Sequence, residues 1–293
     1  FIDLVYAPKY DAQSDIYLDM LEELEAAAAI LSLDSGTSAF GSADFLFQGD
    51  LIKWKKFANS MMLRLGFRLI KVAPAAAKSW VTKAISGGVM QSNADIVYFQ
   101  HATTPLSSQN GSAAGFAQDD QIRLSNTFVN FMQTRNDPRL PILAARKSDG
   151  SNKYIDLKGL PNGLDANLLL QLTGENDTND YAEPSAIVKD LAAPMFWQTY
   201  AEVEFMLAEA AERWGLSGGD PEPHYNAGVR AAMKMLEIYG SEAVIDAADI
   251  DAYLLANPFD AANAIEQINT QYWAATFLND YESYSNWRRS GYP

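Results

Sequence analysis

The sequence contains no cysteine and only two histidines among its 293 residues. The absence of cysteine excludes a disulfide framework and every metal or redox site built on thiolates. The two histidines, His101 and His224, lie far apart in the sequence and form no H-E-x-x-H pair, so this zinc-protease signature is absent as well. The lack of disulfides does not fix the cellular compartment, because many exported bacterial proteins have none.

Long apolar runs and clusters of positive charge are also missing. No window reaches the roughly 18 consecutive apolar residues of a membrane span, and the first ten residues, FIDLVYAPKY, have neither the basic nor the apolar region of a signal peptide. The chain has 37 acidic and 22 basic side chains, a formal net charge of -15, and its basic residues are scattered. We therefore expect no nucleic acid partner, since binding to phosphates needs a basic patch or stripe.

What the sequence does have is a large apolar fraction, 48% hydrophobic and 12% aromatic residues, which is enough for a sizeable core. Residues 11–31 have apolar side chains at helical spacing, and Asp11 or Ser14 can cap the start of this helix. The four alanines at 26–29 predict a helix face that packs closely on the next helix.

Two further helices are predicted before residue 88. The segment LIKWKKFANSMMLRLGFRLI after Asp50 places its apolar side chains on one face and its basic side chains, Arg64 among them, on the rest. Pro74 fits the first turn of the next helix, which Gly87 and Gly88 terminate. Three helices in a short stretch, two of them rich in alanine, indicate stacked helical hairpins.

Between Val89 and Pro194 the chain is rich in Gly, Asn, Ser, Asp and Pro, which predicts long loops around one helix at 125–133. Helical spacing returns at FWQTYAEVEFMLAEAAERWG and continues to Trp287. We therefore predict one mainly α-helical domain over residues 1–293. Its helical layer comprises 8–88 and 195–287, and its loop-rich cap, 89–194, carries the presumed ligand site.

Signatures of catalysis and of cofactor binding are absent. The stretch GSAAG has alanine where a nucleophile elbow needs serine, and no phosphate-binding loop is present. The acidic stretch GENDTNDY lacks the Gly and the Glu of a calcium loop, since those places hold Ala182 and Val188. We expect no catalytic residue, no metal and no cofactor. A pair of glycosidase carboxylates depends on a distance in space, so a glycoside hydrolase stays a third alternative.

Six stretches resemble one family in their order and spacing: PKYDAQSDIY, GDLIKWKKFANSMMLRLGFRL, NDPRL, GLPNGL, TYAEVEFMLAEAAERW with YNAGVRAAM, and YWAATFLNDYESYSNWRRSGYP. They are similar to the SusD/RagB-like outer-membrane nutrient-binding lipoproteins of Bacteroidota. The resemblance implies a right-handed, tetratricopeptide-like helical stack. It also implies a non-catalytic binder of oligosaccharide that delivers its ligand to a SusC-type TonB-dependent transporter.

Two departures from the family pattern concern the chain ends. Family members are longer, begin with a lipoprotein signal and a lipid-bearing cysteine, and continue beyond a motif like RRSGYP. We therefore expect this sequence to be a fragment that lacks the signal and a C-terminal tail. The resemblance places the full-length protein on the extracellular face of the outer membrane, held by a lipid anchor.

Aromatic residues in or beside the cap are the candidates for ligand contact, because an exposed ring can stack on the face of a sugar. The predicted ligand-binding residues are Tyr98, Phe99, His101, Tyr154, Tyr181 and Trp197. A turn histidine is the alternative interpretation of His101. The runner-up function is a tetratricopeptide-type scaffold that grips a peptide in a groove lined by Asn, Lys and Arg.

Overall fold

The computed structural model describes residues 9–32, 36, 38–119, 121–174 and 177–293. Its helices are α1 (Gln13–Leu31), α2 (Leu51–Arg68), α3 (Pro74–Gly87), α4 (Gly111–Gln118), α5 (Asn126–Thr134), α6 (Leu140–Leu143), α7 (Ala166–Thr173), α8 (Tyr200–Trp214), α9 (Pro221–Lys234), α10 (Ala247–Ala256), α11 (Ala264–Ala275) and α12 (Asp280–Ser290). The strands are β1 (Val97–Phe99), β2 (Ala144–Arg146), β3 (Ala182–Pro184) and β4 (Met195–Gln198). The predicted mainly helical fold is confirmed. Over the described ranges, no helix is long and apolar enough to cross a membrane.

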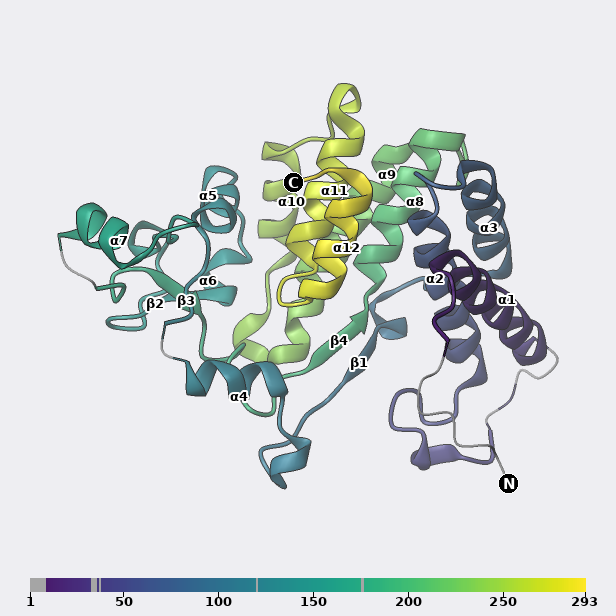
Figure 1. The fold of residues 1–293 in the computed structure, drawn as a ribbon, viewed down its shortest axis with the longest axis horizontal. Helices are drawn as coiled ribbons and strands as arrows, with labels where there is room; N and C mark the ends of the chain where they lie inside the picture. Colours follow the sequence, from purple (N-terminus) through teal and green to yellow (C-terminus); the bar gives the residue numbers. More distant parts are fainter. Residues whose placement is uncertain (1–8, 33–35, 37, 120, 175–176) are drawn as a thin grey trace.

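The helices form two groups that lie side by side (Figure 1). In the first group α2 packs against both α1 and α3, and in the second α8 packs against α9 and α11. The two groups are joined where α2 contacts α8, although these helices are far apart in the sequence. Helical hairpins that pack sideways on one another are the arrangement expected of a tetratricopeptide-like layer.

Local capping signals set several helix starts where the sequence places them. The Asp50 side chain accepts hydrogen bonds from the backbone N–H groups of Ile52 and Lys53 at the start of α2. Pro74 occupies the first turn of α3, where its missing N–H has no helical partner to lose. These starts agree with the prediction because the signals are local.

The start of α8 differs from the prediction. Thr199 and Glu202 form a capping box, in which each side chain accepts a hydrogen bond from the backbone N–H of the other residue. The helix therefore begins at Tyr200. Residues 195–198, which were predicted to belong to the helical layer, form β4 and pair with β1 of the cap.

The helix α1 packs on the next helix, α2, as predicted, but fewer of its alanines are buried than the prediction implies. Of the four alanines at 26–29 only Ala28 is buried, and Leu21 is the other buried residue of this helix. Four consecutive residues cover more than a full helical turn, so only one of them faces a single neighbour. The N-cap is Ala12, which offers no side-chain hydrogen bond, so neither Asp11 nor Ser14 caps this helix.

The helix α8 is the centre of the core, since every residue from Ala201 to Ala211 is buried. Its partner α9 approaches it at Gly228, where a Cβ atom would lie 2.7 Å from a ring carbon of Phe205. A distance this short is a steric overlap. The α8–α9 spacing therefore depends on a glycine at this position.

A buried cluster of ion pairs joins α2 to α8 and α12, and it includes Arg64 and Arg68, two of the basic side chains that were predicted to lie outside the apolar face of α2. The Arg64 Nη2 atom lies 2.5 Å from Glu202 Oε2, and Arg68 Nη2 lies 2.5 Å from Glu282 Oε1. The Tyr272 hydroxyl lies between the two carboxylates, 3.1 Å from Glu202 and 2.7 Å from Glu282. Burial raises the pKa of Glu202. Arg64 and Arg68 lower the pKa of Glu282, although burial acts in the opposite direction.

A second buried cluster surrounds Glu209 of α8. Its carboxylate accepts two hydrogen bonds from Arg289 of α12, both 2.7 Å long, and one of 2.6 Å from Arg213. Asn269 of α11 and Asn286 of α12 complete the cluster through hydrogen bonds to Glu209 and Arg289. Arg289 of the RRSGYP motif thus links α12 to Glu209 in the core.

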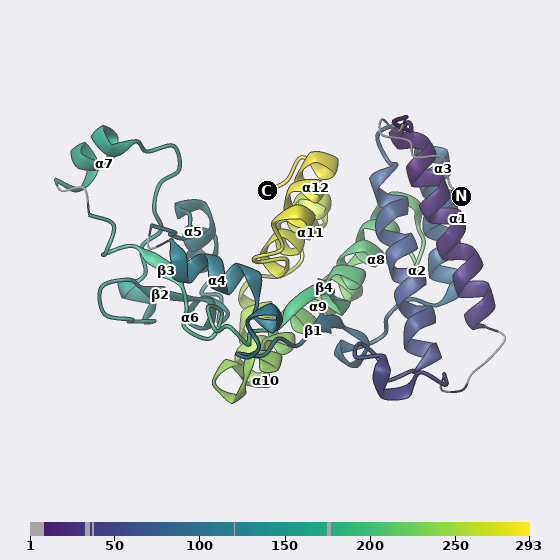
Figure 2. The same ribbon diagram turned by 60° about the horizontal axis from the view of Figure 1, so that its bottom comes forward.

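The part of the cap from α4 to β3 lies beside the second helical group, on the side away from α1–α3, in both ribbon views (Figures 1 and 2). Its strands pair as β1 with β4 and β2 with β3, both antiparallel. The helix predicted at 125–133 is α5, and Ser125 caps it through the Phe128 N–H. The short helices α4, α6 and α7 were not predicted. The last of these lies at the far end of the cap (Figure 2).

Candidate functional site

Four of the six predicted site residues lie on or beside the β1–β4 ribbon: Tyr98, Phe99, His101 and Trp197. The antiparallel pairing places Tyr98 opposite Phe196 and Phe99 opposite Met195. Successive side chains of a strand point to opposite faces. Phe99 and Met195 therefore share one face of the ribbon, and Tyr98 shares the other face with Phe196. The register shifts between Val97 and Tyr98, so Trp197 lies at a bulge, where the alternation is interrupted.

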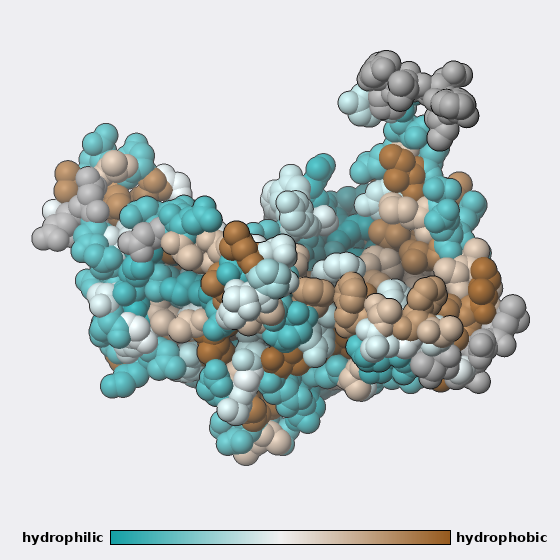
Figure 3. All heavy atoms as spheres, turned by 90° about the horizontal axis from the view of Figure 1, so that it is seen from below, coloured by the Kyte–Doolittle hydropathy of each residue, from teal (hydrophilic) through white to brown (hydrophobic). Residues whose placement is uncertain are grey.

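We call Phe45, Phe99, Met195 and Trp197 the ribbon face. The rings of Phe45 and Phe99 meet edge to face at 5.6 Å, and Met195 and Trp197 are each about half exposed. Figure 3 shows the molecule from the side of the ribbon, with apolar side chains gathered between the cap and the first helical group. A half-exposed indole beside other rings is a surface on which the apolar face of a sugar can stack.

His101 lies at the edge of the ribbon face, with its ring 4.8 Å from that of Phe99. Its Nδ1 atom lies 3.0 Å from the Ser108 carbonyl oxygen, to which it donates a hydrogen bond. This bond leaves Nε2 as an acceptor, and that atom is buried without a protein partner. His101 is therefore held in place by a turn, as the alternative interpretation expected, and its second nitrogen is unused.

Tyr98 points to the opposite side of the ribbon. Its ring lies 5.9 Å from that of Phe196, which in turn lies 5.8 Å from Tyr239. These three rings pack β1 and β4 against the 3-10 turn Met235–Tyr239 that follows α9. Tyr98 is thus only partly exposed.

Tyr154 and Tyr181 lie elsewhere in the cap. The Tyr154 hydroxyl donates a hydrogen bond to the Asp137 carbonyl oxygen, and burial raises the pKa of this phenol. Tyr181 is 1% exposed, and the Lys158 ammonium lies 4.4 Å from its ring. The prediction of an exposed ring at Tyr181 is therefore wrong, because the side chain is buried where the chain enters β3.

The structure also contains a cleft that the sequence did not predict, between the cap and the turn from α11 to α12. We call it the cap cleft. Its volume is about 730 Å³, and its lining includes Phe116, Arg123, Phe128, Trp273, Phe277 and Asp280. A cleft of this volume is within the range of small-molecule sites. Trp273 and Phe277 are one helical turn apart, a spacing visible in YWAATFLND, but nothing in the sequence indicates that α4 and the loop after it lie opposite them.

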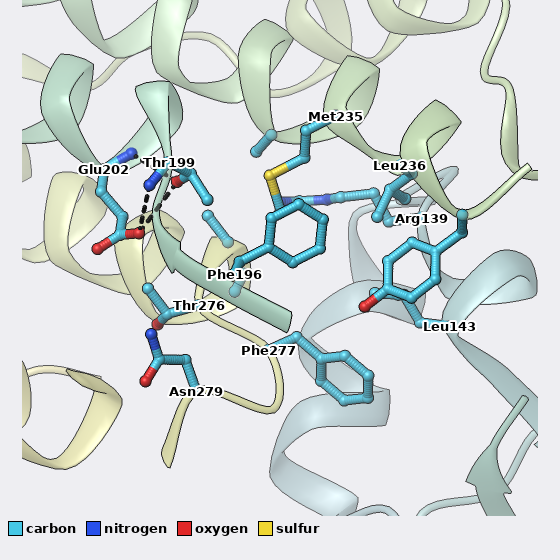
Figure 4. A pocket seen from close by; sticks show the side chains of 14 residues that line it. Arg139, Leu143, Phe196, Thr199, Glu202, Met235, Leu236, Thr276, Phe277 and Asn279 are labelled. Atoms are coloured by element: carbon cyan, nitrogen blue, oxygen red, sulfur yellow. Dashed lines mark hydrogen bonds between the residues drawn. The ribbon is translucent and has the colours of Figure 1, made fainter. Parts of the chain in front are cut away.

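Two smaller cavities lie near the cap cleft. One shares Phe277, Leu278 and Asp280 with the cap cleft and has a volume of about 150 Å³. The other, a recess of about 30 Å³, has Phe196, Phe277 and Arg139 among its lining residues. In Figure 4 the Arg139 side chain extends behind the Phe196 ring, and Thr199 and Glu202 are hydrogen bonded to each other at the other side of the recess.

Comparison with known proteins places this architecture. Residues 3–293 match the SusD-like family described as starch-binding and associating with the outer membrane. The chain belongs to this family. No curated protein sequence matches it.

Solved structures agree with the assignment to the SusD-like family. A chitin-binding protein shares 34% identity at a TM-score of 0.85, with 98% of this chain and 62% of that chain covered. A SusD-like protein named Bacteroidetes AC2a has 27% identity and a TM-score of 0.83, with 98% and 67% covered. A SusD homologue from Bacteroides uniformis, at 24% identity and a TM-score of 0.79 with 98% and 62% covered, shows the shared fold alone. This SusD-like chain thus spans less than two thirds of the length of the chitin-binding protein.

The carboxylates of this SusD-like chain bear on the glycosidase alternative. The buried glutamates Glu202, Glu209 and Glu282 are each paired with an arginine, so none of them is free to protonate a sugar oxygen. Within the described ranges, no group of three or more acidic or histidine side chains is placed to hold a metal ion. Part of the acidic stretch GENDTNDY, residues 175–176, lies outside those ranges.

Proposed function

We propose that this SusD-like protein captures an oligosaccharide at the cell surface, without catalysis, and passes it to a SusC-type TonB-dependent transporter in the outer membrane. The observation that carries the proposal is the ribbon face, where the Phe99 ring packs against Phe45 and the Met195 and Trp197 side chains of β4 are each about half exposed. Lipid anchoring and the extracellular face of the membrane belong to the same proposal, by membership of the family.

The chemistry of this surface suits a sugar. The carbon-bound hydrogens of a pyranose cover one apolar face, which packs on an indole or phenyl ring, while its hydroxyl groups need polar partners at the rim. Gln100 supplies such a partner next to Phe99, since its side chain is exposed. A few stacked rings and hydroxyl bonds give modest binding, with Kd roughly between micromolar and millimolar.

The surfaces of this chain favour a saccharide over the peptide that a tetratricopeptide scaffold would grip. A peptide groove of that type would be lined by Asn, Lys and Arg side chains. The ribbon face is instead made mainly of aromatic side chains, and the lining of the cap cleft combines aromatic, aliphatic and polar side chains without Asn or Lys. We therefore rank the scaffold second.

The test is calorimetric titration of the protein with oligosaccharides. Oligomers of N-acetylglucosamine come first, because the chitin-binding protein is 34% identical, and malto-oligosaccharides second, because of the family description. We expect one of these to bind and Trp197→Ala to weaken that binding about tenfold, or ~1.4 kcal/mol. Tyr181→Phe serves as a control, because Tyr181 is buried.

Two results would contradict the proposal. The first is the absence of binding by every oligosaccharide while a peptide or a cofactor binds tightly. The second is release of shortened sugars during incubation, which would mean catalysis. Transport is tested separately, by uptake of labelled oligosaccharide in cells that carry the full-length protein with or without Trp197→Ala, where we expect slower uptake by the variant.

A further inference from the structure

The ribbon face contains one ring from outside the β1–β4 ribbon, that of Phe45, which comes from the loop between α1 and α2. The Phe45 side chain is 71% exposed and meets the Phe99 ring edge to face at 5.6 Å. A ring this exposed contributes little to the core, because most of its apolar surface stays in contact with water. The position of Phe45 is therefore set mainly by the backbone of its own loop.

The carboxylate of Asp44, the residue before Phe45, closes this loop into a turn. Its Oδ1 atom accepts hydrogen bonds of 3.1 and 3.2 Å from the backbone N–H groups of Leu46 and Phe47. Its Oδ2 atom accepts one of 2.9 Å from the Gly49 N–H. One carboxylate thus holds three backbone groups that follow Phe45, and we call this stretch, residues 44–49, the Asp44 turn.

Two consecutive residues of the Asp44 turn have unusual backbone angles. Gln48 has a φ of 55° and Gly49 a φ of 83°. The left-handed region is strained for a residue with a side chain such as Gln48. The Gln48 N–H donates to the Asp44 carbonyl oxygen at 2.9 Å, and the Gly49 N–H donates to the Asp44 carboxylate. These bonds offset the strain, so we expect the turn to open when the carboxylate is removed.

The same carboxylate links the Asp44 turn to α2. The Trp54 indole N–H donates a hydrogen bond of 2.7 Å to Asp44 Oδ2, and the Trp54 ring packs edge to face on the buried Phe47 ring at 5.3 Å. Burial by itself would raise the pKa of Asp44, but the hydrogen bonds from Trp54 and from the backbone N–H groups lower it. Asp44 is therefore an ionised acceptor at neutral pH, which forms stronger hydrogen bonds than a neutral group. The turn that carries Phe45 is fixed to a long helix of the first group.

We propose that Asp44 is a positioning residue of the glycan site, which holds the Phe45 ring against Phe99 and so extends the ribbon face toward the first helical group. Asp44 acts through Phe45 and needs no contact with the ligand. The ribbon face then has two separately anchored parts, the β1–β4 ribbon and the Asp44 turn. This inference rests on the proposed function and assigns a role in it to a loop of the helical layer.

The test is a double-mutant cycle, measured by calorimetric titration with whichever oligomer of N-acetylglucosamine or glucose binds the wild-type protein more tightly. The variants are Phe45→Ala, Asp44→Ala and the double variant that carries both changes. We expect each single change to weaken binding about threefold to tenfold, because the ring is removed or displaced. The double variant should bind within about twofold of Phe45→Ala, because Asp44 has no ring left to position.

Asp50 offers a matched control in the same segment of the chain. Its carboxylate also accepts hydrogen bonds from two backbone N–H groups, those of Ile52 and Lys53, but it caps α2. Asp50→Ala should therefore lower Tm, as Asp44→Ala does, while the oligosaccharide affinity of the folded protein stays within about twofold of wild type. A loss of Tm in Asp44→Ala without a loss of affinity would mean that Asp44 has a structural role alone, and would overturn the proposal.

Two further measurements keep the result clear if Asp44→Ala folds poorly. Trp54→Phe removes the indole N–H that Asp44 accepts but keeps a ring beside Phe47, and it should weaken oligosaccharide binding about twofold to fivefold. A crystal structure of Asp44→Asn, which has one acceptor oxygen in place of two, should show the Phe45 ring displaced from Phe99. An unchanged contact between these two rings would contradict the proposal.

The outcomes distinguish a failure of this inference from a failure of the proposed function. If Trp197→Ala weakens oligosaccharide binding while Asp44→Ala and Phe45→Ala leave it unchanged, the role of Asp44 is refuted and the glycan-binding function stands. If the losses of the two single variants multiply in the double variant, Asp44 does not act through Phe45. If the wild-type protein binds no oligosaccharide, the proposed function fails, and the role of Asp44 in recognition fails with it.

Discussion

The glutamate at the centre of the second ion cluster provides the sharpest test of how the helices are held together. Glu209→Gln keeps the shape of the side chain but removes its charge, which leaves the buried Arg289 guanidinium without a counterion. In the native protein this carboxylate accepts hydrogen bonds of 2.7, 2.7 and 2.6 Å from Arg289 and Arg213. The substitution therefore tests a charge interaction at nearly constant volume.

Two independent arguments give the size of the effect. Removing one partner of a buried ion pair costs about 3–5 kcal/mol, because the other charge stays buried and unpaired. Burial by itself would raise the pKa of Glu209, but Arg289 and Arg213 lower it from the ordinary 4.5 to about 2, which corresponds to about 3 kcal/mol of stability at neutral pH. We expect Glu209→Gln to lower the free energy of unfolding by about 3 kcal/mol.

The assay is urea unfolding followed by far-UV circular dichroism, at pH 7 and at steps down to pH 3. Because the folded pKa of Glu209 is lowered, its contribution is complete above pH 4.5 and declines as the pH falls toward 2. The difference between wild type and Glu209→Gln should therefore shrink in acid. Asp149→Asn, which breaks an exposed pair with Arg146, is the control and should change little. A loss below about 1 kcal/mol at pH 7 would refute the reasoning.

Three other changes have definite expected outcomes. Gly228→Ala should lower the free energy of unfolding in urea by about 1–3 kcal/mol, because its methyl group would overlap the Phe205 ring. The Glu204 carboxylate lies 2.6 Å from His224 and raises the pKa of that imidazole. The stabilising contribution of the protonated His224 is therefore complete below pH 6.5 and is lost as the pH rises through the raised folded pKa. From pH 6 to pH 9, Tm should fall more in the wild type than in His224→Gln. Tyr181→Phe removes a buried hydroxyl without a hydrogen-bond partner, so Tm should stay constant or rise and glycan binding should not change.

Each of these three substitutions has a control or a result that would contradict the expected outcome. Gly115→Ala alters a helical glycine with open space around it and should stabilise slightly, so an equal loss for both glycines would mean that contact with Phe205 is unimportant. An identical pH profile of Tm for wild type and His224→Gln would mean that the protonation of His224 does not contribute to stability. A large loss of glycan affinity in Tyr181→Phe would mean that the cap rearranges to expose this ring.

The elements that the sequence predicts well are those whose signals are local. Asp50 and Pro74 set the starts of α2 and α3 through hydrogen bonds and dihedral angles within one turn. The start of α8 was missed by a few residues because FWQ continues an apolar pattern that also suits a strand. Only the pairing of β4 with β1 decides between the two.

The burial and the ion pairing of charged residues could not be predicted, because their partners are distant in the sequence. Arg64 has the spacing of a solvated helix face, yet it pairs with Glu202, which lies 138 positions away. The helical period shows which residues share a face. It does not show that α2 packs against three other helices, α1, α3 and α8, which leave little of its surface to solvent. Periodicity therefore predicted the helix and missed its surroundings.

Two of the predicted site residues, Tyr181 and Trp197, differ in exposure because contacts with segments distant in the sequence decide it. Tyr181 and Trp197 both occur as aromatics among polar loop residues, a pattern that predicts exposure for both. Tyr181 comes directly before β3 and is 1% exposed, whereas Trp197 lies at the bulge of the β1–β4 ribbon and is 48% exposed. The direction of a side chain on a short strand depends on register, and register is set by the partner strand.

The cap cleft shows that the division into a rigid helical layer and an adaptable ligand-binding cap is too simple. Trp273 and Phe277 come from α11 and the turn after it, and both also pack on Phe128 in the core, so changing either ring changes stability together with any recognition. Phe116 faces them from α4 and belongs to no such cluster of rings. Substitutions that alter ligand preference at low cost in stability are therefore expected on the α4 side of the cap cleft, because the rings on the α11 side also pack in the core.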